Sequence, residues 1–324
     1  MGGDEAPAPM VAGAVRAALH LGVGILLVGP SDRIRAELDR HPESGHLPIG
    51  VIDAADVVAM QEPPLSALRR KPRASVKVAA EAVRDGRAHA LFSAGHTGAT
   101  VLSARAVFGP LAGADRPALA VTIPTRAGRA VLLDAGANAD CRADHLVQFG
   151  VMGAAYARVD LRLDDPRVGL LSIGEEAGKG NELIRDAHAG LLRAAVTFIG
   201  NLEARELFAG RADVIVCDGF TGNIALKVAE GLVEAVEHML REESGEPAGE
   251  AGIVATEAFT RFRRRVDYAE YGGAPLLGVG AVTVVAHGRS SARAVERGIA
   301  MAARLAEERV VERLGQALSS QSGR

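Results

Sequence analysis

The chain has 324 residues, of which 48% are hydrophobic and 24% are charged, and its formal net charge at pH 7 is -3. A chain of this length and composition is globular, and it forms either one large α/β domain or two smaller ones. It has no Trp, 3% aromatic residues and no overall positive charge. It therefore lacks the stacking side chains and the basic field of nucleic-acid-binding proteins, and we expect no nucleic-acid partner.

The cysteines and the apolar stretches indicate a cytoplasmic protein. The two cysteines, Cys141 and Cys217, fit a reducing compartment better than a disulfide framework. Cys217 follows an apolar run, and we interpret it either as a nucleophile or as a small buried side chain. The apolar stretch 21–29 is too short to span a membrane, and the first residues do not have the layout of a signal peptide. No spacing typical of metal ligands occurs, so we expect neither a metal nor a cofactor.

Apolar runs of strand length alternate with amphipathic helical patterns along the chain. This alternation predicts a three-layer α/β/α fold, in which helices cover both faces of a largely parallel sheet. Residues 63–73 are interpreted as a solvated basic loop, and residues 271–278 as a turn-rich segment. We expect helices at 10–20, 32–40, 75–84, 146–159, 224–240 and 292–318, and strands at 24–28, 49–52, 119–123, 130–133, 168–173, 198–201, 214–217 and 282–285.

Two turns of the form Gly-x-Thr-Gly each join an apolar run to a helical pattern. They are Gly95 to Gly98, preceded by Ser93, and Gly219 to Gly222, preceded by Asp218 and followed by Asn223. Glycines let the backbone approach a ligand closely, and the free N–H groups of a helix's first turn bind anions. One such turn alone is typical of a tight connection. Two of them beside polar residues favour an anion site, and they indicate either an internal duplication or a cleft lined by two helix N-termini.

Other polar residues follow predicted strands, at the edge where ligands bind in open α/β sheets. A lysine between glycines before a helix is a common way to present a cation to a phosphate. A histidine after a strand either caps the next helix or lines the site. The residues concerned are Gly3 and Asp4 near the start, Asp134 and Asn138 after strand 130–133, Lys179 before Asn181, and His287 after strand 282–285.

Two basic segments are candidates for contact with an acidic partner. The first is Arg69, Arg70 and Lys71, within residues 63–73. The second is a helical pattern at 253–265, which follows a stretch rich in Gly, Glu and Ser. We interpret it with equal weight as a helix that lies on an anionic membrane or an acidic protein, and as an ordinary surface or subunit-interface helix. Its contact residues are Phe259, Arg261, Phe262 and Arg264.

The motifs together resemble one known family along essentially the whole chain. They are MGGD at 1–4, SAGHTGA at 93–99, LDAGANADC at 133–141, SIGEEAGKGNEL at 172–183, CDGFTGNIALK at 217–227, YGGAPLLGV at 271–279 and HGRS at 287–290. This combination is highly specific. It resembles the acyl-carrier-protein (ACP):phosphate acyltransferases of bacterial phospholipid synthesis, the PlsX family.

The resemblance implies a fold like that of the isocitrate and isopropylmalate dehydrogenases and the phosphotransacetylases. It implies a single domain over residues 1–324, with an insertion near 242–266 that faces a membrane or a partner. It also implies a homodimer that transfers a long-chain acyl group from acyl-ACP to inorganic phosphate, which gives acyl phosphate and free ACP. The protein would associate peripherally with the membrane, where a glycerol-3-phosphate acyltransferase works next.

The chain departs from the family pattern in three places. The family has a strand and an aspartate directly before MGGD, whereas this sequence begins at that Met, so either the start lies upstream or a strand is absent. His96 stands where the family usually has Asn, which brings a titratable group to the site. Arg73-Ala74-Ser75 stands where the family usually has Asp-Ser-Ser.

Direct transfer fits the chemistry of phosphate and of a thioester. Phosphate is already an anionic nucleophile and a thiolate leaves with little acid help, so the site has to position phosphate and stabilise the carbonyl oxyanion. We expect His96, Lys179, Asp218 and His287 to take part in catalysis, with either histidine bonding the carbonyl or protonating the sulfur. The residues expected to bind phosphate or substrate are Gly3, Asp4, Ser93, Gly95, Thr97, Gly98, Asp134, Asn138, Asn181, Gly219, Thr221, Gly222, Asn223 and Lys227.

Two other functions remain open at this point. A short-chain phosphate acetyl- or butyryltransferase that uses acyl-CoA shares the fold and the acyl-phosphate chemistry. A dimeric scaffold without turnover could recruit the membrane acyltransferase. A nicotinamide-dependent dehydrogenase is disfavoured, because no Gly-x-Gly-x-x-Gly follows the first strands.

Overall fold

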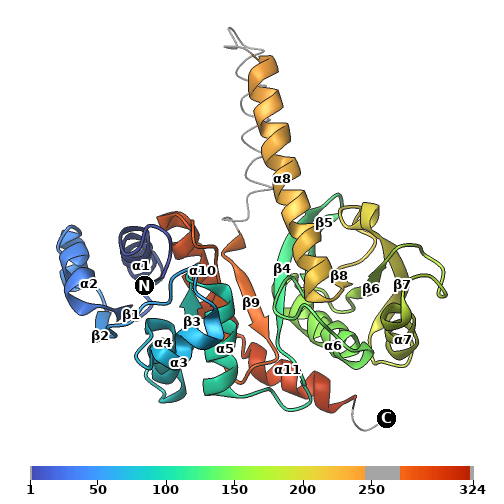
Figure 1. Cartoon of the computed structure of the whole chain (residues 1–324), viewed down its shortest axis with the longest axis horizontal. Coiled ribbons are helices and arrows are strands. Elements are labelled where there is room, and N and C mark those ends of the chain that lie inside the picture. The colour runs from blue at the N-terminus through green and yellow to red at the C-terminus, as the bar shows by residue number, and fades with distance from the viewer. Residues whose placement is uncertain (1, 245–270, 322–324) are drawn as a thin grey trace.

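A computed structural model describes residues 2–244 and 271–321 (Figure 1). Residue 1 and residues 245–270 and 322–324 lie outside the described part. The expected helix at 253–265, with its contact residues Phe259, Arg261, Phe262 and Arg264, therefore lies outside the described residues, as does most of the expected insertion near 242–266. Within the described part, no helix is both long and apolar enough to cross a membrane.

Ten strands among the described residues form two sheets. A sheet of eight strands has the order β3-β10-β9-β4-β5-β8-β6-β7, and β1 and β2 form a separate parallel pair. The strands are β1 (Ile25–Gly29), β2 (Ile49–Asp53), β3 (Ala90–Ser93), β4 (Ala118–Thr125), β5 (Gly128–Leu133), β6 (Arg167–Ser172), β7 (Thr197–Glu203), β8 (Val214–Val216), β9 (Ala274–Leu277) and β10 (Val282–Val285).

Helices cover both faces of the large sheet, which confirms the predicted α/β fold. Alternating residues of β5 point to opposite faces: Val131 and Leu133 pack on the side of α6, whereas Ala130 and Leu132 pack with Ala225 of α8. The helices are α1 (Ala8–Leu21), α2 (Ser31–Leu38), α3 (Pro64–Arg70), α4 (Ser75–Arg84), α5 (Thr97–Phe108), α6 (Ala143–Asp160), α7 (Glu182–Leu191), α8 (Gly219–Ser244), α10 (Ala292–Glu307) and α11 (Val310–Ser319). Short 3-10 turns occupy Pro42–His46 and Ala204–Glu206.

The sheet is mostly parallel, but its middle is antiparallel, and one of the strands there was not indicated by the sequence pattern. β9 pairs antiparallel with β10 on one side and with β4 on the other, and β4 pairs antiparallel with β5. The interpretation of 271–278 as a turn-rich segment was therefore wrong for Ala274–Leu277. The strand has four residues, includes Pro275, and lies between Gly273 and Gly278, both with positive φ, so the turn signals outweighed it.

Three further expectations were corrected by the structure. The basic loop contains helix α3, because Pro63 and Pro64 occupy the positions at a helix start where proline is tolerated. The single helix expected at 292–318 is two helices, broken where Arg309 adopts a left-handed conformation with φ 53°. Helix α8 begins at Gly219, so the turn around Thr221 is its first turn.

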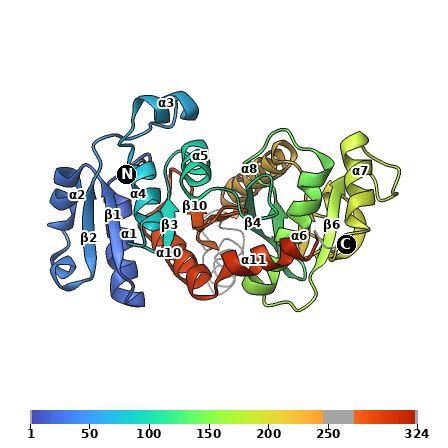
Figure 2. The same cartoon turned by 90° about the horizontal axis from the view of Figure 1, so that it is seen from below.

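A cleft separates the two sheets. It lies between β1 and β3, has a volume of about 830 Å³, and is bordered by α4 and α10 (Figure 2). Its walls are mostly apolar, and residues of β1 that face it, such as Leu26 and Leu27, are half-buried. One end of the cleft reaches Gly3 and Ser93, so it opens beside the loops described next.

Candidate functional site

Three loops converge at the C-terminal ends of β3 and β10. The Asp4 N–H donates to the Gly288 carbonyl at 2.9 Å. A Cβ at Gly3 would lie 3.1 Å from the same oxygen and 3.4 Å from the Ala94 carbonyl. A Cβ at Gly2 would lie 3.3 Å from the Gly95 Cα, so the glycines near the start are needed for close approach. The structure thus brings together residues 2–4, 93–98 and 287–290, as expected.

The first turn of α5 has unoccupied donors at this junction. His96 is the N-cap, and its Nδ1 accepts from the Ala99 N–H at a long 3.4 Å. Within the described residues, the N–H groups of Thr97 and Gly98 have no acceptor. The Ser93 hydroxyl accepts from the Gly95 N–H at 3.3 Å and from the Thr100 hydroxyl at 2.9 Å. This turn can therefore bind an anion with backbone groups alone.

Asp134 is buried and holds its own loop together. Its carboxylate accepts from the N–H groups of Leu119, Gly136, Ala137 and Asn138 at 2.8 to 3.1 Å, and from the Asn138 side-chain amide at 2.8 Å. Burial raises the pKa of Asp134, and these donors oppose the rise. Because the side chain is 0% exposed, it supports the loop and has no open face toward a substrate.

The first turn of α8 lies against this loop, and its N–H groups are paired within the protein except that of Phe220, which has no acceptor among the described residues. The Gly219 N–H donates to the Asn138 carbonyl at 2.8 Å. Asp218 caps the helix, because its carboxylate accepts from the Thr221 N–H and from the Thr221 hydroxyl, both at 2.8 Å. An internal carboxylate therefore occupies the position that a bound anion would take. Asn223 packs near Gly136, with its Oδ1 3.6 Å from the position of a Cβ there.

His287 follows β10, in the loop that meets residues 2–4. Burial lowers its pKa, and the nearby positive charge of Lys227 on α8 lowers it further. Asp4 also faces this ring and acts in the opposite direction. Lys227 itself pairs with Glu230 at 2.8 Å. His287 is therefore neutral at pH 7, and Lys227 of α8 lies within electrostatic reach of its ring.

Lys179 and Asn181 are placed in a different loop. Asn181 caps α7 by accepting from the Ile184 N–H at 3.0 Å, and Lys179 is exposed and lies over Gly174. Among the described residues, no contact joins either side chain to the α5 or α8 turn.

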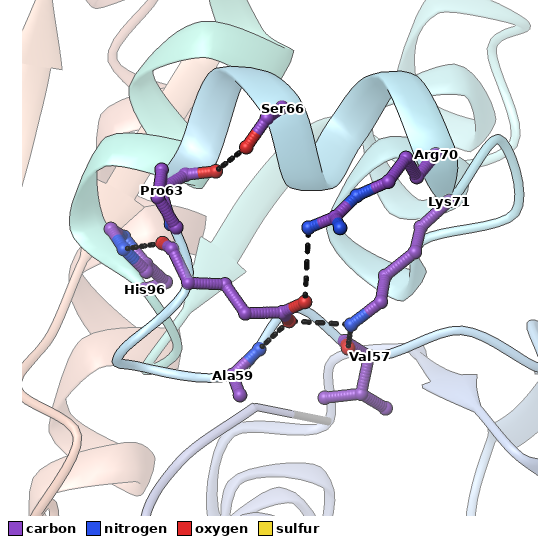
Figure 3. Close-up of polar contacts among 8 residues, drawn as sticks. Val57, Ala59, Pro63, Ser66, Arg70, Lys71 and His96 are labelled. Atoms are coloured by element: carbon purple, nitrogen blue, oxygen red, sulfur yellow. Dashed lines mark hydrogen bonds and ion pairs between the residues drawn. The ribbon is translucent and has the colours of Figure 1, made fainter.

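The basic segment at α3 divides into exposed and anchored residues. Arg69 and Arg70 are exposed, whereas Lys71 donates to Glu62 at 2.5 Å and to the Val57 carbonyl at 2.7 Å (Figure 3). Sequence reasoning missed Glu62, because a single glutamate before two prolines carries no pattern signal. Lys71 is a structural residue here, and Arg69 and Arg70 form the accessible basic face.

Neither cysteine is presented as a nucleophile. Cys217 is buried, and burial together with Asp134 raises the pKa of its thiol well above the usual value. Burial and the same carboxylate raise the pKa of Cys141 to about 11. The interpretation of Cys217 as a small buried side chain fits this environment.

Two solved structures share the fold of this chain. A phosphotransacetylase from Streptococcus pyogenes is similar with a TM-score of 0.64 and 20% identity, over 93% of each chain. The EutD phosphotransacetylase from Staphylococcus aureus is similar with a TM-score of 0.60 and 16% identity, over 92% of each chain. The predicted likeness to the phosphotransacetylase fold is therefore confirmed.

Sequence relatives identify the family. A family model described as "Fatty acid synthesis protein" (FA_synthesis) matches residues 1–313. A phosphate acyltransferase of Nitratidesulfovibrio vulgaris is 48% identical over 322 residues, which are 98% of this chain and 93% of that protein. A phosphate acyltransferase of Trichlorobacter lovleyi is 46% identical over 325 residues, which are 100% of this chain and 94% of that protein. The chain belongs to this family, as its motifs predicted.

Proposed function

We propose that this chain transfers a long-chain acyl group from acyl-ACP to inorganic phosphate. The observation that carries the proposal is the first turn of α5, where two N–H groups are unoccupied beside the converging loops at Gly3 and Gly288. It is supported by relatives that are named phosphate acyltransferases and are 44–48% identical. A backbone cradle of this kind suits a tetrahedral anion.

The reaction needs one displacement. A phosphate oxygen held by the N–H groups of Thr97 and Gly98 attacks the thioester carbon, and a C–O bond forms. The C–S bond breaks, its electron pair leaves on the sulfur as a thiolate, and solvent protonates that thiolate. His287 is neutral at pH 7, so it can donate a hydrogen bond to the carbonyl oxygen as negative charge develops there. Such a donor is typically worth about 3 to 4 kcal/mol.

The test is phosphate-dependent thiol release by the folded chain, with palmitoyl-ACP and acetyl-CoA compared as donors. Release from palmitoyl-ACP that requires phosphate supports the proposal. Release from acetyl-CoA alone supports the short-chain alternative. Phosphate binding without release from either donor supports a scaffold.

Carrier docking is proposed at Arg69 and Arg70, whose exposed guanidinium groups suit an acidic protein. Reversing both charges should raise the KM for acyl-ACP at least several-fold, because steering and contact are lost together. The KM for phosphate should stay unchanged. Equal responses of both constants would remove α3 as the docking surface.

The chain is proposed to work as a homodimer that pairs through α8. Along this helix, which projects from the body in Figure 1, Phe220, Ile224, Val228 and Leu232 are spaced by four residues and are 46 to 65% exposed. A continuous apolar stripe of this kind is typical of a surface that a second copy covers. Leu232→Glu should convert the dimer to a monomer, which light scattering would detect as a halved molar mass. An unchanged molar mass would reject α8 as the dimer interface.

Peripheral membrane association and delivery of acyl phosphate to a membrane glycerol-3-phosphate acyltransferase are proposed from the family alone. The residues expected to carry this contact, Phe259, Arg261, Phe262 and Arg264, lie outside the described part. Flotation with anionic vesicles should recover the wild type and lose a variant with both phenylalanines changed to Ser. Equal recovery would place the contact elsewhere.

A further inference from the structure

Both nitrogens of the His96 ring are occupied by the protein. Nε2 lies 3.1 Å from the Glu62 carbonyl oxygen, and Nδ1 lies 3.4 Å from the Ala99 N–H (Figure 3). A carbonyl oxygen only accepts, so Nε2 carries the proton and Nδ1 accepts from Ala99. A doubly protonated ring would lose the Ala99 contact. Both ring nitrogens are therefore turned to protein groups and neither to a substrate.

Glu62, whose carbonyl is the partner of His96, joins the loop before α3 to the end of that helix through its carboxylate. Its carboxylate accepts from the Ala59 N–H at 2.9 Å and from Lys71 Nζ at 2.5 Å, and it lies 3.8 Å from Arg70. Lys71, at the far end of α3, also donates to the Val57 carbonyl at 2.7 Å. The hydrogen bonds from Lys71 and from the Ala59 N–H keep the pKa of Glu62 below its usual range. Residues 57–71 thus form a closed unit, which the side chains of Glu62 and Lys71 hold together.

This unit packs directly on the first turn of α5. Ala67 of α3 and Ala99 of α5 are 0% and 1% exposed and share a cluster with Val58. Space is so short that a Cβ at Gly98 would lie 3.0 Å from Pro64 Cγ. The helix that presents Arg69 and Arg70 and the turn with the unoccupied N–H groups are consequently joined through one small interface, which the His96–Glu62 bond crosses.

We propose that His96 is a positioning residue, which uses Glu62 to fix the basic helix α3 against the phosphate-binding turn, and that it transfers no proton during the reaction. The inference rests on the proposed function, because it assigns a role within that reaction. It replaces the expectation that His96 acts as an acid or a carbonyl donor. It also assigns Glu62 a purpose, since this carboxylate sets where Arg70 and Lys71 are held.

Two substitutions at position 96 test the proposal. In His96→Asn, the amide oxygen takes the place of Nδ1 and can accept from Ala99, and the shorter amide N–H can donate to the Glu62 carbonyl once the loop at residue 62 moves closer, so kcat should remain within about threefold and the pH profile should keep its shape. His96→Ala removes both bonds, and it should raise the KM for phosphate and for acyl-ACP at least several-fold with a smaller change in kcat. Loss of turnover in His96→Asn together with loss of one limb of the pH profile would overturn the proposal.

Glu62→Ala provides a second, independent variant. It keeps the His96 ring and its contact to the Glu62 backbone, but it releases Lys71 and Arg70. It should raise the KM for acyl-ACP and leave the KM for phosphate unchanged, and an equal effect on both would count against the proposal. His145→Asn is a matched control: this histidine also lies in a helix's first turn, where its Nδ1 accepts from the Arg142 N–H at 3.1 Å. The control should leave both constants unchanged.

A binding readout separates this proposal from the proposed function. Inorganic phosphate is titrated into labelled protein while the amide signals of Thr97 and Gly98 are followed, first in the wild type and then in the two His96 variants. Weaker phosphate binding in His96→Ala, restored in His96→Asn, supports the positioning role even if acyl-ACP proves not to be the donor. Equal binding in all three would overturn it.

Discussion

The two Gly-x-Thr-Gly turns have the same sequence form, but the helices that start there differ in the charge of their cap and in how many N–H groups are paired. At α5, His96 makes one long cap contact, and the N–H groups of Thr97 and Gly98 stay unoccupied within the described residues. At α8, Asp218 takes the Thr221 N–H and hydroxyl at 2.8 Å. The residue before each helix makes the difference, since a carboxylate neutralises the helix N-terminus and an imidazole does not. The motif therefore marks a tight connection in both places, and the proposed anion site is the one at α5, where the cap is uncharged.

The largest expected effect is the difference in stability loss when the last glycine of each turn, Gly98 or Gly222, is changed to Ala. A Cβ at Gly222 would lie 2.0 Å from the Asp134 carbonyl oxygen and 2.9 Å from Cys217 Sγ, whereas at Gly98 the nearest atom is Pro64 Cγ at 3.0 Å. Gly222→Ala should cost about 3 kcal/mol or more, because backbone must move, and Gly98→Ala about 1 kcal/mol. Urea unfolding of both variants measures this. Equal losses would contradict the structural difference between the turns.

Asp134→Asn should cause the next largest loss of stability. The loss should arise in the loop that packs against α8, without affecting the α5 turn. The amide turns one acceptor into a donor and leaves buried N–H groups without a partner, at a cost of roughly 2 to 3 kcal/mol. The loss appears as a lower unfolding midpoint. Phosphate affinity of the protein that remains folded should not change. A stable Asn variant with weak phosphate binding would instead place Asp134 in contact with substrate.

Removing the cap at α8 should have a smaller effect. Asp218→Ala loses the Thr221 bonds and should lower stability by about 1 kcal/mol, as other N-cap deletions do. Because phosphate is proposed to bind at the first turn of α5, the KM for phosphate should stay within about twofold of the wild-type value. A tenfold change in that constant, in either direction, would show that α8 also contacts phosphate.

The cysteines should give the smallest effect. A thiol whose pKa is raised to about 11, as for Cys141, stays protonated until the pH approaches that value, and burial raises the pKa of Cys217 as well. Native protein at pH 8 should therefore react slowly with iodoacetamide, and labelling should speed up on unfolding or at higher pH. Cys217→Ala should keep full turnover. Loss of turnover with a normal unfolding midpoint would indicate a covalent acyl-enzyme.

The fold could be predicted from sequence wherever hydrophobic periodicity was strong. β5, β8 and β10 read as apolar runs because they are buried on both faces, and α4 was placed with its observed bounds. β9 was missed, because its four residues include a proline and are flanked by glycines, and pairing on both sides holds it in the sheet. Local pattern does not record such pairing.

The candidate site was predicted in outline and not in detail. Motifs located the loops at Gly3, Ser93 and His287, since small residues at strand ends are a local signal. They did not distinguish an open turn from one filled by its own carboxylate, because that depends on side-chain direction. Asp134 shows the same limit, since its carboxylate turns inward to bond its own loop. Glu62 had no signal at all, because its partner His96 is distant in sequence.

The most direct test of the account follows phosphate at both turns in one experiment. Inorganic phosphate is titrated into isotope-labelled protein, and the backbone amide signals of Thr97, Gly98, Thr221 and Gly222 are recorded together. We predict that the amide signals of Thr97 and Gly98 shift and reach saturation, and that those of Thr221 and Gly222 stay nearly unchanged. Saturable shifts at Thr221 and Gly222, with Thr97 unmoved, would contradict it.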